Sequence, residues 1–366
     1  MFSLFKPTRR AAGAALLSLM GLLFATTASL AAAPATAPAN VPAARPAAVA
    51  VHEEGFVQAN GIEHWVTIHG ENAANPVVLF LHGGPGNPNT PYADAVYGAW
   101  AKDFTLVQWD QRGAGKTFGR NPGTADSVLT MDLMTNDGLA IAEYVAKRLG
   151  QKKVILMGGS WGSALGVHMA QRRPDLFHAY VGTAQLVSQR ANLAAFYAKT
   201  LALAGAAADD KTVAALTALG APPWQNPRAF GIVRRASRAL EAARTTAPPA
   251  HWWRPAPAYA TPQALAETEA GEDYSWLQFV GLKNNGMAAT IDLPALGTRF
   301  ALPVFLVQGT EDLLTPLSVT QPYFDSIQAP TKALVLVPLA GHDPNAPTVA
   351  AQWQVLKERV LPLVGR

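Results

Sequence analysis

The five residues GGSWG at 158–162 restrict the fold of this chain more than any other segment. They follow the short apolar run 154–157 and precede a helical pattern, so they stand between an expected strand and an expected helix. A Gly-x-Ser-x-Gly turn in this context holds its serine in a strained backbone conformation and exposes the hydroxyl. Side chains at Gly158 and Gly162 would collide with the crossing strand and helix. The five residues alone would also fit the loop of an ordinary βα unit, but their position predicts Ser160 as a nucleophile at a strand end.

Strand-type and helix-type patterns alternate along most of the chain. The strand-type runs are residues 55–59, 62–69, 77–81, 104–109, 154–157, 179–183, 304–308 and 334–337. Helical spacing occurs at 132–149, after Ser160, and at about 316–328 and 347–363. This alternation predicts an α/β fold with a mostly parallel sheet covered by helices on both faces. Asn60-Gly61 between the first two runs predicts a hairpin that adds an antiparallel edge.

Residues 185–296 break this alternation and read as helices and loops without a clear strand. The segment is rich in alanine and carries Arg228, Arg234, Arg235, Arg238, Arg244 and Arg254. A helical block inserted between two strands of a parallel sheet is expected to form a cap over their carboxyl ends, where open α/β sheets bind ligands. The arginines are expected to form a solvated helix face rather than an anion site.

A second glycine-rich segment, HGGPG at 82–86, follows the expected strand 77–81. Its glycines permit a loop whose backbone N–H groups turn inward, so Gly84 and Trp161 are the expected N–H donors of an oxyanion hole. A phosphate-binding loop is disfavoured because Gly-Lys-Ser/Thr is absent and no helix opens directly from the segment. His82 is expected to orient the loop through hydrogen bonds rather than to act as a base.

Asp312 and His342 each follow an expected strand, so they should lie at the same sheet edge as Ser160. Their order in the chain, serine then aspartate then histidine, is that of a nucleophile–acid–base triad on this kind of sheet. His342 would take the Ser160 proton, and Asp312 would fix the imidazole tautomer and stabilise its charged form. The neighbours Glu311 and Asp343 are less favoured candidates for the orienting carboxylate.

The segments HGGPG at 82–86, DQRG at 110–113 and GGSWG at 158–162, together with Gly341-His342, resemble the α/β-hydrolase fold. Within that fold they are most similar to the proline iminopeptidase (prolyl aminopeptidase) group of serine hydrolases. The resemblance covers roughly residues 55–185 and 297–364. It implies a core at 51–184 and 297–366 with a helical cap at 185–296. It also implies the Ser160–Asp312–His342 triad, the Gly84 and Trp161 oxyanion hole, and structural roles for Asp110 and Arg112.

The same resemblance implies an acyl-enzyme mechanism on short peptides or amides with an N-terminal proline or small residue. Such aminopeptidases hold the substrate amine with cap carboxylates, and Glu272 and Asp273, which precede the aromatic stretch 274–279, are the expected pair. A carboxylic-ester hydrolase on the same scaffold is the alternative enzyme. The alternative without enzyme activity is a binding protein that keeps the fold but has lost catalysis. Haloalkane dehalogenases and epoxide hydrolases are disfavoured because both need an acidic nucleophile where Ser160 stands.

The first fifty residues have the composition of a targeting segment and a linker rather than of a folded domain. A basic head with Lys6, Arg9 and Arg10 precedes the uncharged run 11–30, and small residues follow. This pattern predicts a signal peptide cleaved after Ala31, with a retained membrane anchor as the alternative. Residues 32–50 are almost all Ala, Pro and Val and are expected to form an extended linker. The mature protein is thus expected to be periplasmic or secreted, without stable membrane association.

The charge and cysteine counts exclude several functional classes. The chain has 29 Lys+Arg and 25 Asp+Glu, and four of the basic residues but no acidic one lie in residues 1–50. The remainder therefore holds 25 of each, which removes the main argument for a nucleic-acid partner. Because there is no cysteine, disulfides, thiol nucleophiles and cysteine-ligated metals are excluded. No metal or organic cofactor is expected, and the expected partner is a small peptide, amide or ester substrate.

Overall fold

The computed structural model describes residues 49–124, 127–226 and 228–364. The predicted signal peptide and nearly all of the predicted linker lie outside these residues. Within the described ranges, no helix has the length and apolar character needed to cross a membrane. The described residues group into one compact unit by their contacts.

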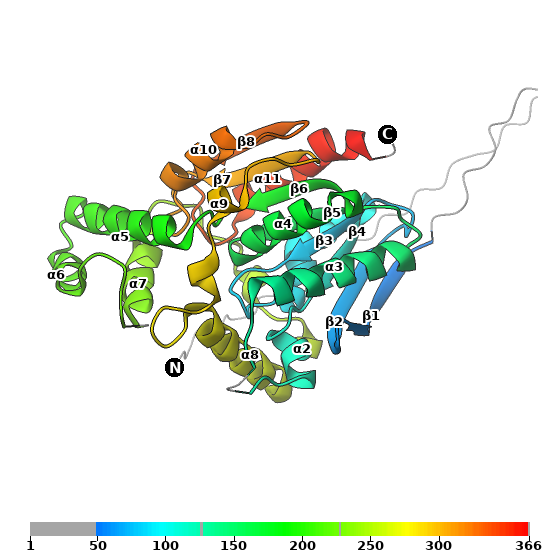
Figure 1. Cartoon of the computed structure of the whole chain (residues 1–366), viewed down its shortest axis with the longest axis horizontal. Helices are drawn as coiled ribbons and strands as arrows, with labels where there is room; N and C mark the ends of the chain where they lie inside the picture. Colours follow the sequence, from blue (N-terminus) through cyan, green and yellow to red (C-terminus); the bar gives the residue numbers. More distant parts are fainter. Residues whose placement is uncertain (1–48, 125–126, 227, 365–366) are drawn as a thin grey trace, which may run out of the picture. The chain divides into compact units, whose positions relative to one another are not determined.

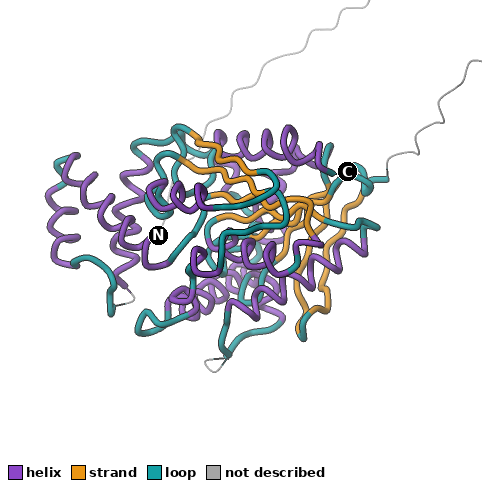
Figure 2. Tube along the Cα trace, turned by 45° about the horizontal axis from the view of Figure 1, so that its top comes forward, coloured by secondary structure: helices purple, strands orange, loops and turns teal. Residues whose placement is uncertain are grey.

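A single eight-stranded sheet organises the described residues (Figures 1 and 2). Its strands are β1 (Val51–Ala59), β2 (Ile62–Gly70), β3 (Val77–Leu81), β4 (Thr105–Trp109), β5 (Val154–Gly159), β6 (Phe177–Thr183), β7 (Val304–Gly309) and β8 (Lys332–Val337). Their order across the sheet is β1-β2-β4-β3-β5-β6-β7-β8. The β1–β2 hairpin and the β2–β4 pair are antiparallel and all other pairs are parallel. The predicted mostly parallel sheet with an antiparallel edge is therefore confirmed.

Helices cover both faces of this sheet because its central strands are apolar on both sides. Val77, Leu79 and Leu81 of β3 pack in one hydrophobic cluster, while Val78 and Phe80 pack in the other, as the period of two along a strand requires. The first cluster includes residues of α3 (Met131–Arg148), α4 (Trp161–Arg172) and α10 (Leu317–Ser326). The second includes residues of α1 (Ala93–Tyr97) and α11 (Ala346–Gln354). Each strand of the centre therefore needs helices on both sides.

The expected helix at 347–363 consists of three successive segments. α11 ends at Gln354 and continues as a π-helical turn, Val355–Val360, and then as a short 3₁₀ turn, Leu361–Leu363. The apolar spacing does not distinguish these closely related helix types. Proline at position 362 stands inside the last turn, where an ideal α-helix would need its N–H.

The insertion between β6 and β7 is helical, and its described residues (185–226 and 228–296) contain no strand. Its α-helices are α5 (Gln189–Ala206), α6 (Asp210–Leu219), α7 (Arg228–Ala242), α8 (Pro262–Val280) and α9 (Leu293–Leu296), and short 3₁₀ turns lie between them. In Figure 1, α5, α6 and α7 group at one end of the sheet, and α8 lies beside α2 (Gly115–Arg120). A separate apolar cluster with Phe196, Leu216 and Val233 holds α5, α6 and α7 together, and it also takes in Leu313 from the loop after β7. The cap is thus anchored directly on a loop of the sheet edge.

Candidate active site

Ser160 stands at a sharp turn between β5 and α4 with φ 52° and ψ −121°. A non-glycine residue with positive φ stores backbone strain, which is common at functional sites. A Cβ on Gly158 would overlap the Gly162 carbonyl, and one on Gly162 would overlap the Leu81 carbonyl of the adjacent strand. The serine therefore needs both glycines, because strand and helix cross too closely for any side chain.

The structure brings together the three residues predicted to form the triad. The Ser160 Oγ lies 3.0 Å from the His342 Nε2. The His342 Nδ1 lies 3.1 Å from the Asp312 Oδ2 and 3.2 Å from the Oδ1. These side chains come from the loops that follow β5, β8 and β7, and parallel strands place their carboxyl ends at one edge. Nucleophile, base and orienting carboxylate thus form one continuous hydrogen-bonded line.

Asp312 is a buried carboxylate with a full set of donors. It accepts hydrogen bonds from the Thr315 backbone N–H (2.8 Å), the Thr315 hydroxyl (2.6 Å) and the Gln308 side-chain amide (3.3 Å). Burial alone would raise the pKa of Asp312, but the charge and hydrogen bond of His342 and the bonds from Thr315 outweigh it and lower the pKa to about 2. Burial likewise opposes protonation of His342, but the Asp312 carboxylate outweighs it and raises the pKa of the imidazole. The Asp312 carboxylate therefore stabilises the imidazolium that forms when His342 acts as a general base.

The loop at 82–86 lies directly against the serine. A Cβ on Gly83 would stand 3.4 Å from the Ser160 Cβ, and Gly84 has a φ of +109° that glycine adopts readily. Trp161 is the first residue of α4, so its N–H has no carbonyl partner within the helix. The two N–H groups predicted to form an oxyanion hole therefore belong to two backbone segments that adjoin the nucleophile.

His82 holds this loop in place. Its Nε2 accepts a hydrogen bond from the Gln111 N–H (3.1 Å), so its Nδ1 must carry the proton and donate to the Gly83 carbonyl (2.9 Å). Burial lowers the pKa of His82 to about 4, which keeps the ring neutral. Gln111 also accepts a hydrogen bond from the Trp161 indole (2.8 Å) and so connects the loop to the start of α4. His82 is a structural histidine, as expected.

Asp110 and Arg112 also serve the architecture beside the serine. Asp110 is buried and accepts hydrogen bonds from the Thr90 hydroxyl and the Lys116 N–H, and burial raises its pKa to about 7. The Arg112 Nε donates to the Asp137 carboxylate of α3 at 2.7 Å. Asp110 and Arg112 therefore bond to different neighbouring residues and not to each other.

A cleft of about 1360 Å³ opens above Ser160 and His342, and Glu272 and Asp273 of α8 line it as well. α8 reaches this position because it packs on the loop at 82–86: a Cβ on Gly86 would stand 2.9 Å from the Glu272 Cα. Both carboxylates are exposed to solvent within the cleft. Partial burial, and then the neighbouring Asp273, raise the pKa of Glu272. The carboxylates expected to meet the substrate amine thus share a cleft with the nucleophile.

A family model described as the alpha/beta hydrolase fold matches residues 76–346, which is most of the chain. The chain belongs to this family. The probable aminopeptidase YbaC of Bacillus subtilis is 26% identical over 307 residues, covering 81% of this chain and 92% of that protein. A proline iminopeptidase of Neisseria meningitidis is 35% identical over 124 residues, covering 33% of this chain and 36% of that protein. The hydrolase therefore has relatives with aminopeptidase names along most of its length.

A solved structure of similar fold is the proline iminopeptidase of Mycobacterium smegmatis. Its TM-score is 0.58 at 22% identity, and the match covers 85% of this chain and 96% of that chain. At this identity the likeness supports the fold alone.

The sequence prediction missed two cap residues that hold both catalytic loops of the hydrolase. Glu241 of α7 is buried and accepts hydrogen bonds from the Leu313 N–H (2.7 Å) and from the Arg234 guanidinium (3.1 Å). Arg234 in turn donates to the Asp343 carboxylate at 3.0 Å. Leu313 and Asp343 adjoin Asp312 and His342, so α7 fixes the loops on which the base and its orienting carboxylate stand.

The expectation of a solvated arginine face is wrong for Arg234. This residue is only 8% exposed, because its side of α7 faces the catalytic loops rather than solvent. The available signal was the spacing of Arg234 and Glu241, which are seven residues apart and therefore share a helix face. Asp343 is thus the cap's partner and not the carboxylate that orients His342. Glu311, the other neighbour considered, pairs with Arg244 at 2.7 Å.

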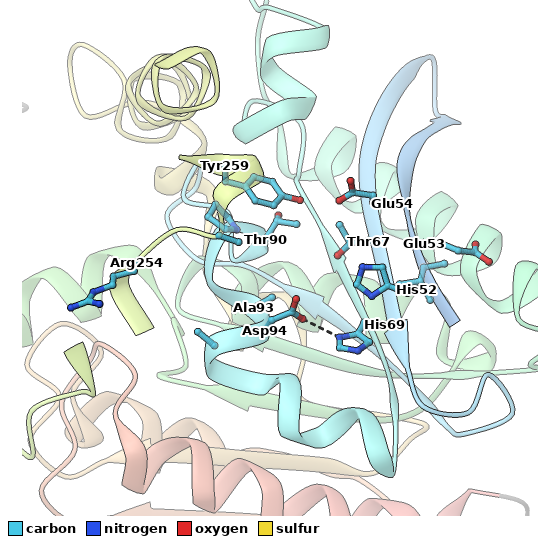
Figure 3. Close-up of a pocket in the computed structure, with 14 residues that line it drawn as sticks. His52, Glu53, Glu54, Thr67, His69, Thr90, Ala93, Asp94, Arg254 and Tyr259 are labelled. Carbon is cyan, nitrogen blue, oxygen red and sulfur yellow. Dashed lines mark hydrogen bonds and ion pairs between the residues drawn. The ribbon is translucent and has the colours of Figure 1, made fainter. Parts of the chain in front are cut away.

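A smaller cavity of about 280 Å³ lies beside β1, β2 and α1 (Figure 3). Its polar lining includes His52, His69 and Asp94, and the His69 Nδ1 lies 3.0 Å from the Asp94 carboxylate. No group of three histidine, aspartate or glutamate side chains in the described residues is arranged to hold a metal ion. None of the triad residues lines this cavity, so the large cleft is the candidate active site.

Proposed function

We propose that this hydrolase is a serine aminopeptidase that removes an N-terminal proline or small residue from short peptides or amides. The observation that carries the proposal is the cleft in which Ser160 and His342 share walls with Glu272 and Asp273. The relatives named aminopeptidase and proline iminopeptidase support the same reading. The reaction needs only groups that this chain supplies.

In the acylation half of the reaction, the Ser160 hydroxyl attacks the carbonyl carbon of the first peptide bond while His342 accepts its proton. The carbonyl oxygen becomes an oxyanion, which the N–H groups of Gly84 and Trp161 stabilise. His342 then donates the proton to the leaving amine, and the C–N bond breaks. The first residue of the substrate remains as an ester of Ser160.

Water completes the reaction in the same site. His342 removes a proton from a water molecule, which attacks the ester carbonyl through a second tetrahedral intermediate. The Ser160 oxygen leaves and recovers its proton from His342. Asp312 stabilises the imidazolium in both halves without becoming protonated, since its pKa of about 2 lies far below neutral pH.

Glu272 and Asp273 give the site its preference for a free amine. A protonated N-terminus carries one positive charge, and two carboxylates on the same turn of α8 attract it into the cleft. An ester without an amine gains nothing from them. The carboxylates therefore separate an aminopeptidase from an esterase built on the same triad.

The proposal is tested by substituting Glu272 with glutamine. We expect kcat/KM for a prolyl or alanyl arylamide to fall by about 10- to 100-fold, as for loss of a charge-assisted hydrogen bond of about 1.5–3 kcal/mol. Hydrolysis of a p-nitrophenyl ester without an amine should fall much less. Both substrates are followed by steady-state absorbance.

Glu269→Gln is the matched control, because Glu269 is an exposed carboxylate of the same helix that does not line the cleft. It should leave the ratio of arylamide to ester hydrolysis unchanged. N-acetylation of the arylamide should remove most of its hydrolysis by wild-type protein. If wild-type protein cleaves the ester readily but no arylamide, the aminopeptidase proposal is wrong and the carboxylic-ester hydrolase takes its place.

We also propose that the protein is exported. The basic head, the uncharged run 11–30 and the small residues after it support this location. N-terminal sequencing of the protein from the periplasm or medium of producing cells should then begin at Ala32. An N-terminus at residue 1 in a membrane fraction would instead indicate the retained anchor.

A further inference from the structure

One face of α7 turns a row of arginines toward the catalytic cleft. Arg228, Gly231, Arg235 and Arg238 all line it, and their spacing of three, four and three residues places them on one side of the helix. All three arginines are exposed within the cleft. This row shares the cleft with Ser160, so it belongs to the space that a substrate occupies.

Two of these arginines have no ion-pair partner among the described residues. Arg238 shares the Asp343 carboxylate with Arg234, at 3.6 Å and 3.0 Å respectively. No described carboxylate lies within ion-pair distance of Arg228 or Arg235. Arg228 and Arg235 therefore present positive charge to the cleft without an ion-pair partner among the described residues.

Gly231 leaves room for an anion between these two arginines. Apart from the backbone of its own helix and its chain neighbours, a Cβ placed on Gly231 would meet only the Arg235 guanidinium, at 3.8 Å, within 4 Å. Arg228 and Arg235 are about two helical turns apart, with Gly231 between them. A planar carboxylate is a natural ligand for guanidinium groups, because two parallel N–H donors match its two oxygens.

The opposite charge lies on a different cap helix of the same cleft. Glu272 and Asp273 belong to α8, whereas the arginines belong to α7. A short peptide is itself charged in this way, with an ammonium at one end and a carboxylate at the other. The two cap helices therefore offer complementary charges for the two ends of one small zwitterionic molecule.

We propose that Arg228 and Arg235 bind the free α-carboxylate on the leaving-group side of a di- or tripeptide. This inference rests on the proposed aminopeptidase function and narrows its substrate to very short peptides with an unmodified C-terminus. It replaces the expectation that these arginines are merely solvated. Their role is specificity, since the nucleophile Ser160 and the base His342 are other residues of the cleft.

The test compares alanyl or prolyl dipeptides and tripeptides that end in a free carboxylate with the same peptides ending in an amide. Wild-type protein should cleave the acid with a kcat/KM about tenfold higher, and the preference should shrink at high salt as charges are screened. The double variant Arg228→Gln/Arg235→Gln should reduce the ratio of acid to amide to near one. Product release is quantified by chromatography.

Arg254→Gln is the matched control, because Arg254 is a cap arginine that lines the smaller cavity instead of the catalytic cleft (Figure 3). It should retain the full acid preference. If wild-type protein cleaves an alanyl arylamide but treats acid and amide alike, the carboxylate site is wrong and the aminopeptidase stands. A double variant that keeps the preference also overturns the site. If wild-type protein cleaves neither arylamide nor peptide, the proposed function fails and the carboxylate site fails with it.

Discussion

Replacement of Ser160 with alanine is expected to abolish covalent labelling by a fluorophosphonate probe and to lower kcat/KM by ~10⁵-fold or more. The reason is that the Ser160 Oγ is the atom hydrogen-bonded to the His342 Nε2 and the one that would form the acyl-enzyme. Without it, the residual oxyanion hole can only assist direct attack by water. Labelling is read by gel fluorescence and kcat/KM by arylamide hydrolysis.

The loss should come from chemistry and not from unfolding. Alanine keeps the same Cβ at φ 52°, so the backbone strain of the turn is unchanged. Thermal unfolding of Ser160→Ala should therefore match wild type closely. Ser163→Ala, in α4, is the control. It removes a hydroxyl that donates to the Ser160 carbonyl, which should cost about 1–2 kcal/mol of stability. The variant should still be labelled by the probe. If Ser160→Ala is still labelled, the triad assignment is wrong. It is also wrong if neither wild-type protein nor the variant is labelled.

The fold and the nucleophile could be predicted from sequence because both depend on local rules. The turn at Ser160 needs small residues at Gly158 and Gly162, and the contacts of these positions show why. Asp312 and His342 could be placed near Ser160 because each follows a parallel strand, and parallel strands end at the same edge. The alternation of strands and helices could thus predict that residues nearly two hundred positions apart in the chain lie close together in space.

The cap could be predicted only as a helical insertion, because its packing depends on contacts that periodicity does not encode. α8 is placed by the Ser275 hydroxyl, which donates to the Gly113 carbonyl at 2.7 Å, and by its close approach to Gly86. α7 is placed by the buried hydrogen bond between Glu241 and the Leu313 N–H. Each of these contacts joins residues far apart in the chain. Which cap residues face the cleft follows from these contacts. The spacing of Arg234 and Glu241 could therefore indicate a shared helix face, but not that this face is buried against the catalytic loops.

Asp312→Asn is expected to lower kcat/KM by about 10⁴-fold with little change in fold. The two Asp312 oxygens accept hydrogen bonds from Thr315 and Gln308, so an asparagine at this position can keep only some of them. The Thr315 N–H, a fixed donor, favours the amide oxygen at the position of Oδ1. The amide NH₂ then faces the His342 Nδ1 and donates to it. This favours the tautomer with the proton on Nε2, which cannot accept the proton of Ser160.

The pH profile separates this tautomer effect from a merely structural one. In wild type, activity needs neutral His342 and should fall as pH drops through its pKa, which lies above the ordinary 6.5 because of Asp312. In Asp312→Asn the carboxylate is gone and burial remains, so the residual activity should persist to lower pH. An acid limb at the same pH in both proteins would contradict this role for Asp312.

The acid limb of the wild-type profile is expected to come from protonation of His342 and not from loss of the Asp312–His342 ion pair. The raised pKa of His342 adds stability that is fully present below pH 6.5 and is lost as pH rises through the folded value. The lowered pKa of Asp312 adds stability that is present above pH 3.8 and is lost as pH falls through about 2. Between these two pH limits the Asp312–His342 pair contributes most to the stability of the folded protein. In the same pH range His342 becomes protonated and cannot act as a base. Activity should therefore fall on mild acidification before the protein unfolds, and return in full when the pH is raised again. Some stability is lost below pH 6.5, because the pKa of buried, neutral His82 is lowered to about 4.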